Sequence, residues 1–202
     1  MGHFTGPRSK IARRFGEPVF GPDKVLDRRA YPPGQHGPVK RRRKMSEYGV
    51  QLREKQKVKA IYGMREKQFR LFFERAKAQK GITGDKLLAM CETRLDNIVY
   101  RLGLAATRAG ARQLVTHRHV TVNGRVCNVP SAIVRPGDVV SIREKDRDMV
   151  AVVYSLKRQA SALVNWLSWD AATMQGTLLA VPSRAEIPEN IEMQLIVELY
   201  SR

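Results

Sequence analysis

The spacing of the apolar residues changes within residues 92–157, and no other feature of the sequence restricts the fold as closely. Over residues 95–102 and 107–115 the apolar side chains recur every three or four positions, which predicts two helices. After His117 they alternate with polar side chains, and Asn123-Gly124 is typical of a tight hairpin turn. We therefore expect strands at residues 120–122, 126–129 and 139–142. Two helices and a small antiparallel sheet predict an α+β module.

A helical domain is expected before this module, over residues 46–91. Helical patterns begin at Ser46, continue over residues 64–80 and resume after Thr83, which suits the N-cap position. The three phenylalanines of the second helix recur at helical spacing. We therefore assign them to the core rather than to a platform on which bases stack.

The first 45 residues form a basic extension that is rich in glycine and proline. Turn-forming residues follow one another, as in Pro32–Pro38, and no periodic apolar pattern is present, so the segment cannot build a core alone. Two interpretations stay open: a disordered basic tail, or an extension that becomes ordered only along a phosphate backbone. Aromatic residues such as Phe15 and Tyr31 favour the second, because disordered tails contain few aromatics.

The charge of the chain is uneven, which predicts the parts that meet a polyanion. The 202 residues contain 37 Lys and Arg against 19 Asp and Glu, a net charge of +18. Residues 1–60 contain 16 against 5, whereas residues 158–202 contain 3 against 5. Nucleic acid should therefore meet the front and middle of the chain. In the acidic tail we expect a helix over residues 156–167 and strands at 177–181 and 193–200, which pack back on the body or face a basic protein.

Several classes of protein and site are excluded by what the sequence lacks. Its longest uncharged stretches, residues 159–169 and 171–183, are shorter than the roughly 20 apolar residues of a membrane-spanning helix. No phosphate-binding glycine loop, dinucleotide fingerprint or nucleophile elbow is present, so we predict no catalytic residues. Cys91 and Cys127 form no Cys-x-x-Cys pair, and we expect neither a metal nor another cofactor. Cys91 falls on the apolar face of a predicted helix and should be buried.

Cationic and imidazole side chains of the module are spaced to form one basic surface. Arg108 and Arg112 are one helical turn apart, and Thr107 can cap their helix, whose N-terminus favours phosphate. His117 and His119 are two residues apart on a predicted strand. They suit contacts to phosphates or bases better than a metal site, which would need a third ligand. The alternative is that these side chains form a scattered, solvated face.

Several short motifs of the module are those of a known RNA-binding family. They are Thr93-Arg94-Leu95-Asp96-Asn97, Leu102-Gly103-Leu104-Ala105, Ala111-Arg112-Gln113-Leu114-Val115, Val120-Thr121-Val122-Asn123-Gly124 and Val134-Arg135-Pro136-Gly137-Asp138. They resemble the small module named after small-subunit ribosomal protein four, which also occurs in RNA-modifying enzymes and tRNA synthetases. The flanks, among them Pro33-Gly34-Gln35-His36-Gly37, extend the resemblance over essentially the whole chain to the bacterial and plastid family of that ribosomal protein. The chain resembles the cysteine-free, zinc-less version of this family, since residues 1–90 contain no cysteine.

The resemblance implies a structural ribosomal protein that binds small-subunit rRNA directly and begins assembly of the subunit body. It also implies a neighbour, ribosomal protein five of the same subunit, and a place near the path by which mRNA enters, where the two proteins support decoding accuracy. The compartment would be the bacterial cytoplasm or the plastid stroma, with no membrane partner. Two alternatives use the same module. One is an RNA-modifying enzyme, which would need a catalytic domain of roughly 100 further residues; the other is a free RNA-binding regulator.

The expected fold is therefore α+β in four parts. These are a basic extension (1–45), a helical domain (46–91), the RNA-binding module (92–157) and a C-terminal helix with strands that pack back on the body (158–202). The candidate RNA-binding residues come from the first three parts: Arg8, Lys10, Arg13, Arg14, Lys40, Arg41, Arg42, Arg43, Lys44, Arg53, Arg94, Arg108, Arg112, Gln113, His117 and His119. Glu189 and Glu192 of the acidic tail are the candidate contacts to ribosomal protein five.

Overall fold

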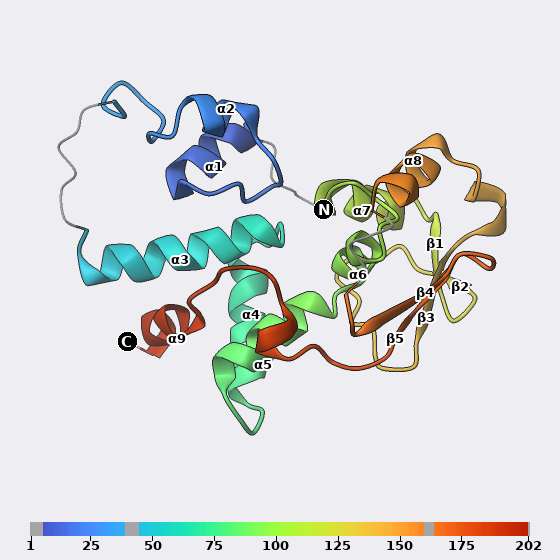
Figure 1. Cartoon of the computed structure of the whole chain (residues 1–202). Helices are drawn as coiled ribbons and strands as arrows, with labels where there is room; N and C mark the ends of the chain where they lie inside the picture. The colour runs from blue at the N-terminus through green and yellow to red at the C-terminus, as the bar shows by residue number, and fades with distance from the viewer. Residues whose placement is uncertain (1–5, 39–44, 160–163, 202) are drawn as a thin grey trace. The chain divides into compact units, whose positions relative to one another are not determined.

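The chain divides into two compact units, and the computed structural model describes residues 6–38, 45–159 and 164–201. The first unit comprises residues 1–84 and 190–202, and the second comprises residues 85–189. The described part of the first unit is built mainly from helices, while the second combines helices with an antiparallel sheet (Figure 1). The predicted α+β class is confirmed. Among the described residues, no helix has the length and apolar character needed to cross a membrane.

The first unit has its core between long helices and the C-terminal helix. Its elements are α1 (Arg8–Phe15), α2 (Lys24–Arg28), α3 (Glu47–Ile61), α4 (Glu66–Lys77) and α9 (Met193–Ser201). Helix α3 begins where predicted, because the hydroxyl of Ser46 accepts a hydrogen bond from the Gly49 N–H at 3.2 Å. The phenylalanines of α4 are buried, which confirms their assignment to the core. Phe73 stacks on Tyr200 of α9 with the ring centroids 4.6 Å apart.

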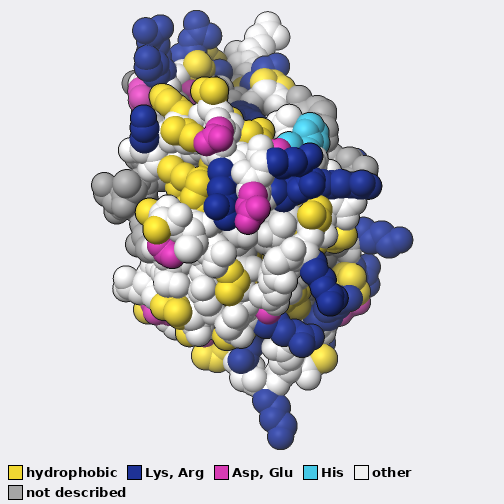
Figure 2. All heavy atoms as spheres, turned by 90° about the vertical axis from the view of Figure 1, so that its right-hand side faces the viewer, with side chains coloured by type: hydrophobic (Ala, Val, Ile, Leu, Met, Phe, Trp, Pro, Cys, Tyr) yellow, Lys and Arg dark blue, Asp and Glu magenta, His cyan; other side chains and the backbone are white. Residues whose placement is uncertain are grey.

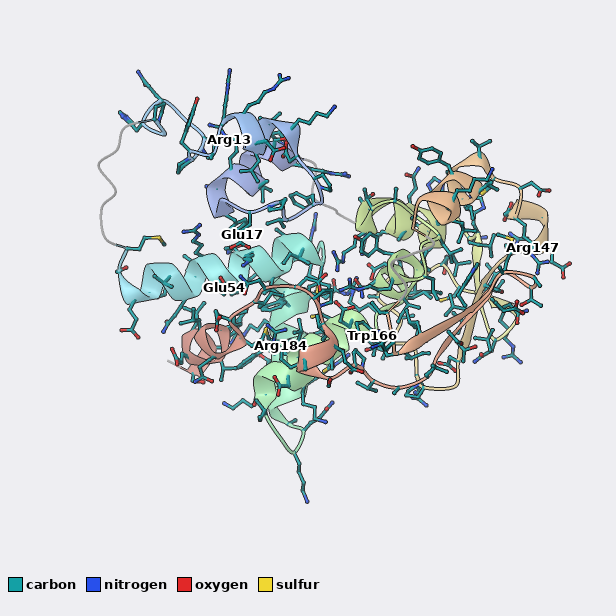
Figure 3. The ribbon with its side chains drawn as sticks, in the orientation of Figure 1. Arg13, Glu17, Glu54, Arg147, Trp166 and Arg184 are labelled. Carbon is teal, nitrogen blue, oxygen red and sulfur yellow. The ribbon has the colours of Figure 1, made fainter. Side chains whose placement is uncertain are left out.

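The described part of the basic extension is helical and shares its core with α3. Ala12 and Phe15 of α1 are buried. Arg53 of α3 donates a hydrogen bond from Nη2 to the Phe15 carbonyl oxygen at 2.6 Å. Lys57 of α3 pairs with Glu17 at 2.7 Å, and Figure 3 labels Glu17 on the side of α1 that faces α3. Arg53 and Lys57 of α3 thus hold the end of α1 within the first unit, and ordering of the extension along a phosphate backbone stays a prediction.

The C-terminal segment of the first unit is a helix, so the strand predicted for residues 193–200 is wrong. Met193 and Ile196 of α9 are buried and lie three residues apart, as on one face of a helix. Gly84 lies against the start of α9, where an added Cβ would come 2.9 Å from the Cβ of Met193. A short apolar run fits either a helix or a strand, and packing in the first unit selects the helix.

The second unit sets helices beside a five-stranded sheet (Figure 1). Its helices are most of α5 (Thr83–Glu92), α6 (Leu95–Arg101), α7 (Arg108–Thr116) and α8 (Val150–Gln159), with short 3-10 turns at Glu144–Asp146 and Arg184–Glu186. Its strands are β1 (Val120–Val122), β2 (Arg125–Val126), β3 (Val139–Ile142), β4 (Leu167–Asp170) and β5 (Gln175–Leu178). The strands pair antiparallel in the order β2-β1-β3-β5-β4.

Local signals in the sequence predict β1 and β3 correctly, whereas the strand predicted at residues 126–129 is wrong beyond Val126, because β2 is Arg125–Val126. Asn123 and Gly124 both have positive φ, 49° and 76°, as the predicted tight turn between β1 and β2 requires. Val120 of β1 lies opposite Ile142 of β3, and both are buried. Gly176 of β5 packs under the helices, because a Cβ there would come 2.4 Å from the side chain of Leu102. The absence of a side chain at this position lets the end of α6 approach the sheet.

The helix predicted over residues 156–167 is placed too late in the chain. Helix α8 occupies Val150–Gln159, and Leu167 already begins β4. The strand predicted at residues 177–181 overlaps β5, which starts and ends earlier. Residues 160–163, in the middle of the predicted helix, lie outside the described residues. The strand pair β4–β5 extends the sheet beyond the three strands that the sequence pattern predicts for the module.

Candidate RNA-binding surface

Three of the four cationic side chains of α1 are exposed, and the fourth forms hydrogen bonds within the first unit. Arg8, Lys10 and Arg14 are exposed, and no contact within the described part of the chain ties their side chains. Arg13, labelled in Figure 3, instead donates from Nε to the carbonyl oxygen of Arg29 at 3.1 Å. Arg13 therefore fastens the segment that follows α2, and the exposed three are the better candidates for phosphate contacts.

The other candidate RNA-binding residues of the first unit are Arg53 and the basic run at residues 40–44. Arg53 of α3 is exposed, although one of its guanidinium nitrogens is engaged by the Phe15 carbonyl. The five residues of the basic run lie outside the described residues: Lys40, Arg41, Arg42, Arg43 and Lys44. Their role in RNA binding stays a prediction from the sequence.

Arg94 of the module is buried in what we call the Asp96 cluster, formed by Arg94, Asp96 and Arg112. Arg94 is 0% exposed and donates to both carboxylate oxygens of Asp96, at 3.0 Å from Nε and 2.6 Å from Nη2. Arg112 of α7 donates to Asp96 Oδ2 at 2.9 Å. Arg94 therefore does not reach the surface, contrary to the prediction, because its charge is compensated by Asp96 two residues later. Arg112 has 19% of its side chain exposed.

A second set of charges, which we call the ionic network, joins Glu92, Asn97, Arg101, Arg108 and Glu189. Arg101 donates to Glu92 at 3.0 and 2.8 Å and to Glu189 at 2.7 and 2.5 Å. Arg108 donates to Asn97 at 2.8 Å and also to Glu189. Burial alone lowers the pKa of Arg101, but the hydrogen bonds and charges of Glu92 and Glu189 raise it above its usual value. The network thus neutralises two arginines inside the second unit.

The ionic network changes the interpretation of two predicted site residues. Glu189 was expected to contact another protein, but its carboxylate accepts hydrogen bonds from Arg101 and Arg108 and only 13% of the side chain is exposed. Arg108 was expected on an open basic surface, but only 17% of its side chain is exposed and its guanidinium also lies over the Tyr100 ring, 4.5 Å from the centroid. The acidic partner is 81 residues away in sequence, so the period of α7 alone does not reveal it. Glu192, by contrast, is exposed.

The end of α7 presents the polar side chains that remain open to solvent. Gln113 and His117 are exposed. His119 is partly buried, with Nδ1 3.0 Å from Asp146 Oδ2, and it lowers the pKa of that carboxyl. Arg118 lies between the two histidines, is exposed, and has a positive φ of 65°. The candidate residues did not include Arg118, although its position between the two histidines was a usable signal.

The distribution of charge agrees with these contacts. On the face drawn in Figure 2, Lys and Arg side chains are interspersed with Asp and Glu side chains rather than gathered in one patch.

Over residues 6–38, 45–159 and 164–201, no group of three or more His, Cys, Asp and Glu side chains could hold a metal ion. Cys91 is fully buried as predicted, and burial raises the pKa of its thiol to about 12, so it is not a nucleophile at neutral pH.

Comparison with known proteins decides the family. The ribosomal protein S4/S9 N-terminal domain matches residues 3–92, and the S4 domain matches residues 93–140. Proteins named small ribosomal subunit protein uS4 match all 202 residues and cover their own full length: 58% identical in Parabacteroides distasonis, 57% in Bacteroides fragilis and 55% in Flavobacterium psychrophilum. The chain belongs to the uS4 family of ribosomal proteins. This confirms the resemblance found in the motifs, and it identifies a ribosomal protein with an S4 RNA-binding domain, not an enzyme.

Proposed function

We propose that this uS4 family member binds small-subunit rRNA directly in the bacterial ribosome, begins assembly of the subunit body and supports decoding accuracy. The observation that carries the proposal is full-length identity of 55–58% to proteins named small ribosomal subunit protein uS4. A net charge of +18 supports a polyanionic partner. The S4 domain lies in the second unit, where α7 presents its polar end to solvent.

Exposed cations, rather than the paired arginines of the module, are proposed to supply the main phosphate contacts. Arg8, Lys10 and Arg14 keep their charges open to solvent on α1. The Asp96 cluster and the ionic network are proposed to hold α6 and α7 in place, because their arginines already donate to carboxylates. The exposed cations of α1 and the paired arginines of the module therefore predict different effects of substitution: loss of binding for the first set and loss of stability for the second.

Binding of an rRNA fragment at several salt concentrations tests the proposal. We expect affinity to fall by orders of magnitude over a few-fold rise in salt, because each phosphate contact releases counterions. Replacing Arg8, Lys10 and Arg14 together by alanine should weaken binding and flatten the slope of log affinity against log salt by about two to three. The matched control, Arg8→Lys with Arg14→Lys, preserves the charges and should preserve the slope. An affinity that does not change with salt would contradict direct phosphate binding.

The proposed protein neighbour is ribosomal protein five, near the path by which mRNA enters the subunit. The support is the motif resemblance together with an exposed carboxylate at Glu192, whose N–H is fixed by Glu54 at 3.0 Å. Glu192→Lys should weaken the contact to ribosomal protein five and alter the frequency of misreading while rRNA binding is retained. Glu144→Lys reverses another exposed carboxylate and serves as the control. Unchanged misreading in ribosomes that contain Glu192→Lys would contradict this role.

Sedimentation separates a ribosomal role from that of a free RNA-binding regulator. A resident ribosomal protein should remain with small subunits through a sucrose gradient in high salt, whereas a regulator should stay in the unbound fraction. Omission of the protein from a reconstitution of the subunit should also reduce the binding of proteins that join later. Normal assembly without it would contradict the proposed role in assembly.

A further inference from the structure

A pocket of about 360 Å³ lies between α7 and α8 in the second unit. The segment Leu104–Thr107, which leads into α7, lines one side, and Ala151 and Tyr154 of α8 line the other. Gln113 and His117 of α7 also line it. The volume lies within the roughly 300–1,000 Å³ of typical small-molecule sites. The pocket is therefore large enough for a compact organic group.

The lining suits a flat, neutral group with polar edges. Leu104 and Leu114, at 0% and 8% exposed, contribute apolar surface. The Gln113 amide and the His117 imidazole, both exposed, can donate and accept hydrogen bonds. Tyr154 is 62% exposed and offers its ring for stacking. Among the described residues, none that lines the pocket is Lys, Arg, Asp or Glu, so this lining offers no ionic partner for a phosphate.

A cation beside the pocket supplies what the pocket lacks. Arg118 lies between His117 and His119, both of which line the pocket, and its side chain is exposed. Nucleotides combine a neutral base, with apolar faces and hydrogen-bonding edges, and a phosphate that a cation attracts. The arrangement of a neutral pocket next to an exposed arginine matches that combination.

We propose that the pocket between α7 and α8 binds one unpaired base of the RNA, with Arg118 close to the adjoining phosphate. The proposal rests on the proposed RNA-binding function and assigns part of it to a specific site. Base recognition here would add contacts that phosphate binding by α1 does not provide. It would favour RNA with an unstacked nucleotide over a fully paired helix of the same charge.

Two RNA hexamers of equal charge separate base binding from phosphate binding in the full-length protein. One is an adenosine hexamer, and the other has the same ribose-phosphate backbone without bases. The adenosine hexamer should bind about tenfold more tightly by fluorescence anisotropy, as expected for a base stacked on an aromatic ring. Equal affinities for the two hexamers would overturn the proposal.

Variants of residues on α8 test whether the preference for the adenosine hexamer arises from the pocket. Ala151→Phe fills the pocket and should abolish the preference for the adenosine hexamer, whereas Val150→Phe, at an 84% exposed position next to it, should retain the preference. Tyr154→Leu should reduce the preference for the adenosine hexamer. Tyr48→Leu removes an exposed tyrosine from the first unit and should leave that preference unchanged. If Ala151→Phe fails to fold, comparison of Tyr154→Leu with Tyr48→Leu decides whether the pocket binds the base. A preference that survives Ala151→Phe in a folded protein, or that survives Tyr154→Leu, would overturn the proposal.

The same variants distinguish failure of this site from failure of the proposed function. If the unaltered protein binds the rRNA fragment but the hexamer preference survives Ala151→Phe, the pocket assignment is wrong and the ribosomal function stands. If the unaltered protein does not bind the rRNA fragment, the proposed function is wrong, and the hexamer comparison still decides whether the pocket takes a base.

Discussion

Replacing Asp96 by asparagine should strongly destabilise the second unit, because Asp96 compensates a buried arginine. Arg94 is 0% exposed and donates two hydrogen bonds to Asp96, at 3.0 and 2.6 Å. Asparagine keeps the size of the side chain, but it removes the negative charge and replaces one acceptor by an N–H₂ donor that faces the guanidinium. The variant therefore leaves a positive charge in the interior without its carboxylate.

The size of the effect follows from the burial of the two arginines that Asp96 contacts. Removing one partner of a buried ion pair costs about 3–5 kcal/mol. Arg112, with 19% of its side chain exposed, should add at most about 1 kcal/mol, since water partly replaces the lost contact. We expect the free energy of unfolding to fall by about 3–6 kcal/mol, out of the roughly 5–15 kcal/mol typical of a folded protein.

Urea unfolding followed by tryptophan fluorescence measures this loss in the relevant unit. The sequence contains 2 tryptophans, and both, Trp166 and Trp169, belong to the second unit. Asp148→Asn removes the same charge from an exposed position and should change the stability by less than about 0.5 kcal/mol. A loss below about 1 kcal/mol for Asp96→Asn would refute the reasoning, because it would mean that Arg94 is compensated without this carboxylate.

Three further predictions concern single contacts. Burial by itself raises the pKa of Glu66, but Lys59 and other partners lower it to about 2, so its contribution to stability is present above about pH 4.5 and is lost as the pH falls towards 2. Glu66→Gln should therefore cost up to about 1 kcal/mol at pH 7 and little near pH 2 in urea unfolding followed by circular dichroism, and an equal cost at both would contradict this. Thr107→Ala removes the hydroxyl that accepts from the Gly110 N–H at 3.1 Å and should cost about 1 kcal/mol by tryptophan fluorescence; Thr107→Ser should restore most of it. Arg108→Ala should lower the melting temperature, because its guanidinium belongs to the ionic network. An unchanged melting temperature would contradict this and would favour the interpretation of Arg108 as part of an open basic surface.

Local patterns in the sequence were sufficient for the part of the second unit from α6 to β3, but not for α8, β4 and β5. The change of apolar period at His117 predicts where helices give way to strands, and Asn123-Gly124 predicts the hairpin because both residues accept positive φ. Helix starts were predicted at Ser46, from the helical pattern, and at Thr107, as a cap, and the hydroxyl of each residue accepts a hydrogen bond from a backbone N–H of its helix. Each of these signals acts over a few residues, so no knowledge of distant parts of the chain is needed.

Tertiary structure alone decided which charged side chains stay open to solvent. The sequence places Arg108 on the polar stripe of α7, but the carboxylate of Glu189 reaches it from 81 residues away. It also leaves the run from Met193 to Tyr200 compatible with a strand, while packing in the first unit makes it a helix. In both cases the determining partner is remote in sequence. The physical reason is that burial of a charge or an apolar face depends on what lies across from it, which the spacing along one segment does not encode.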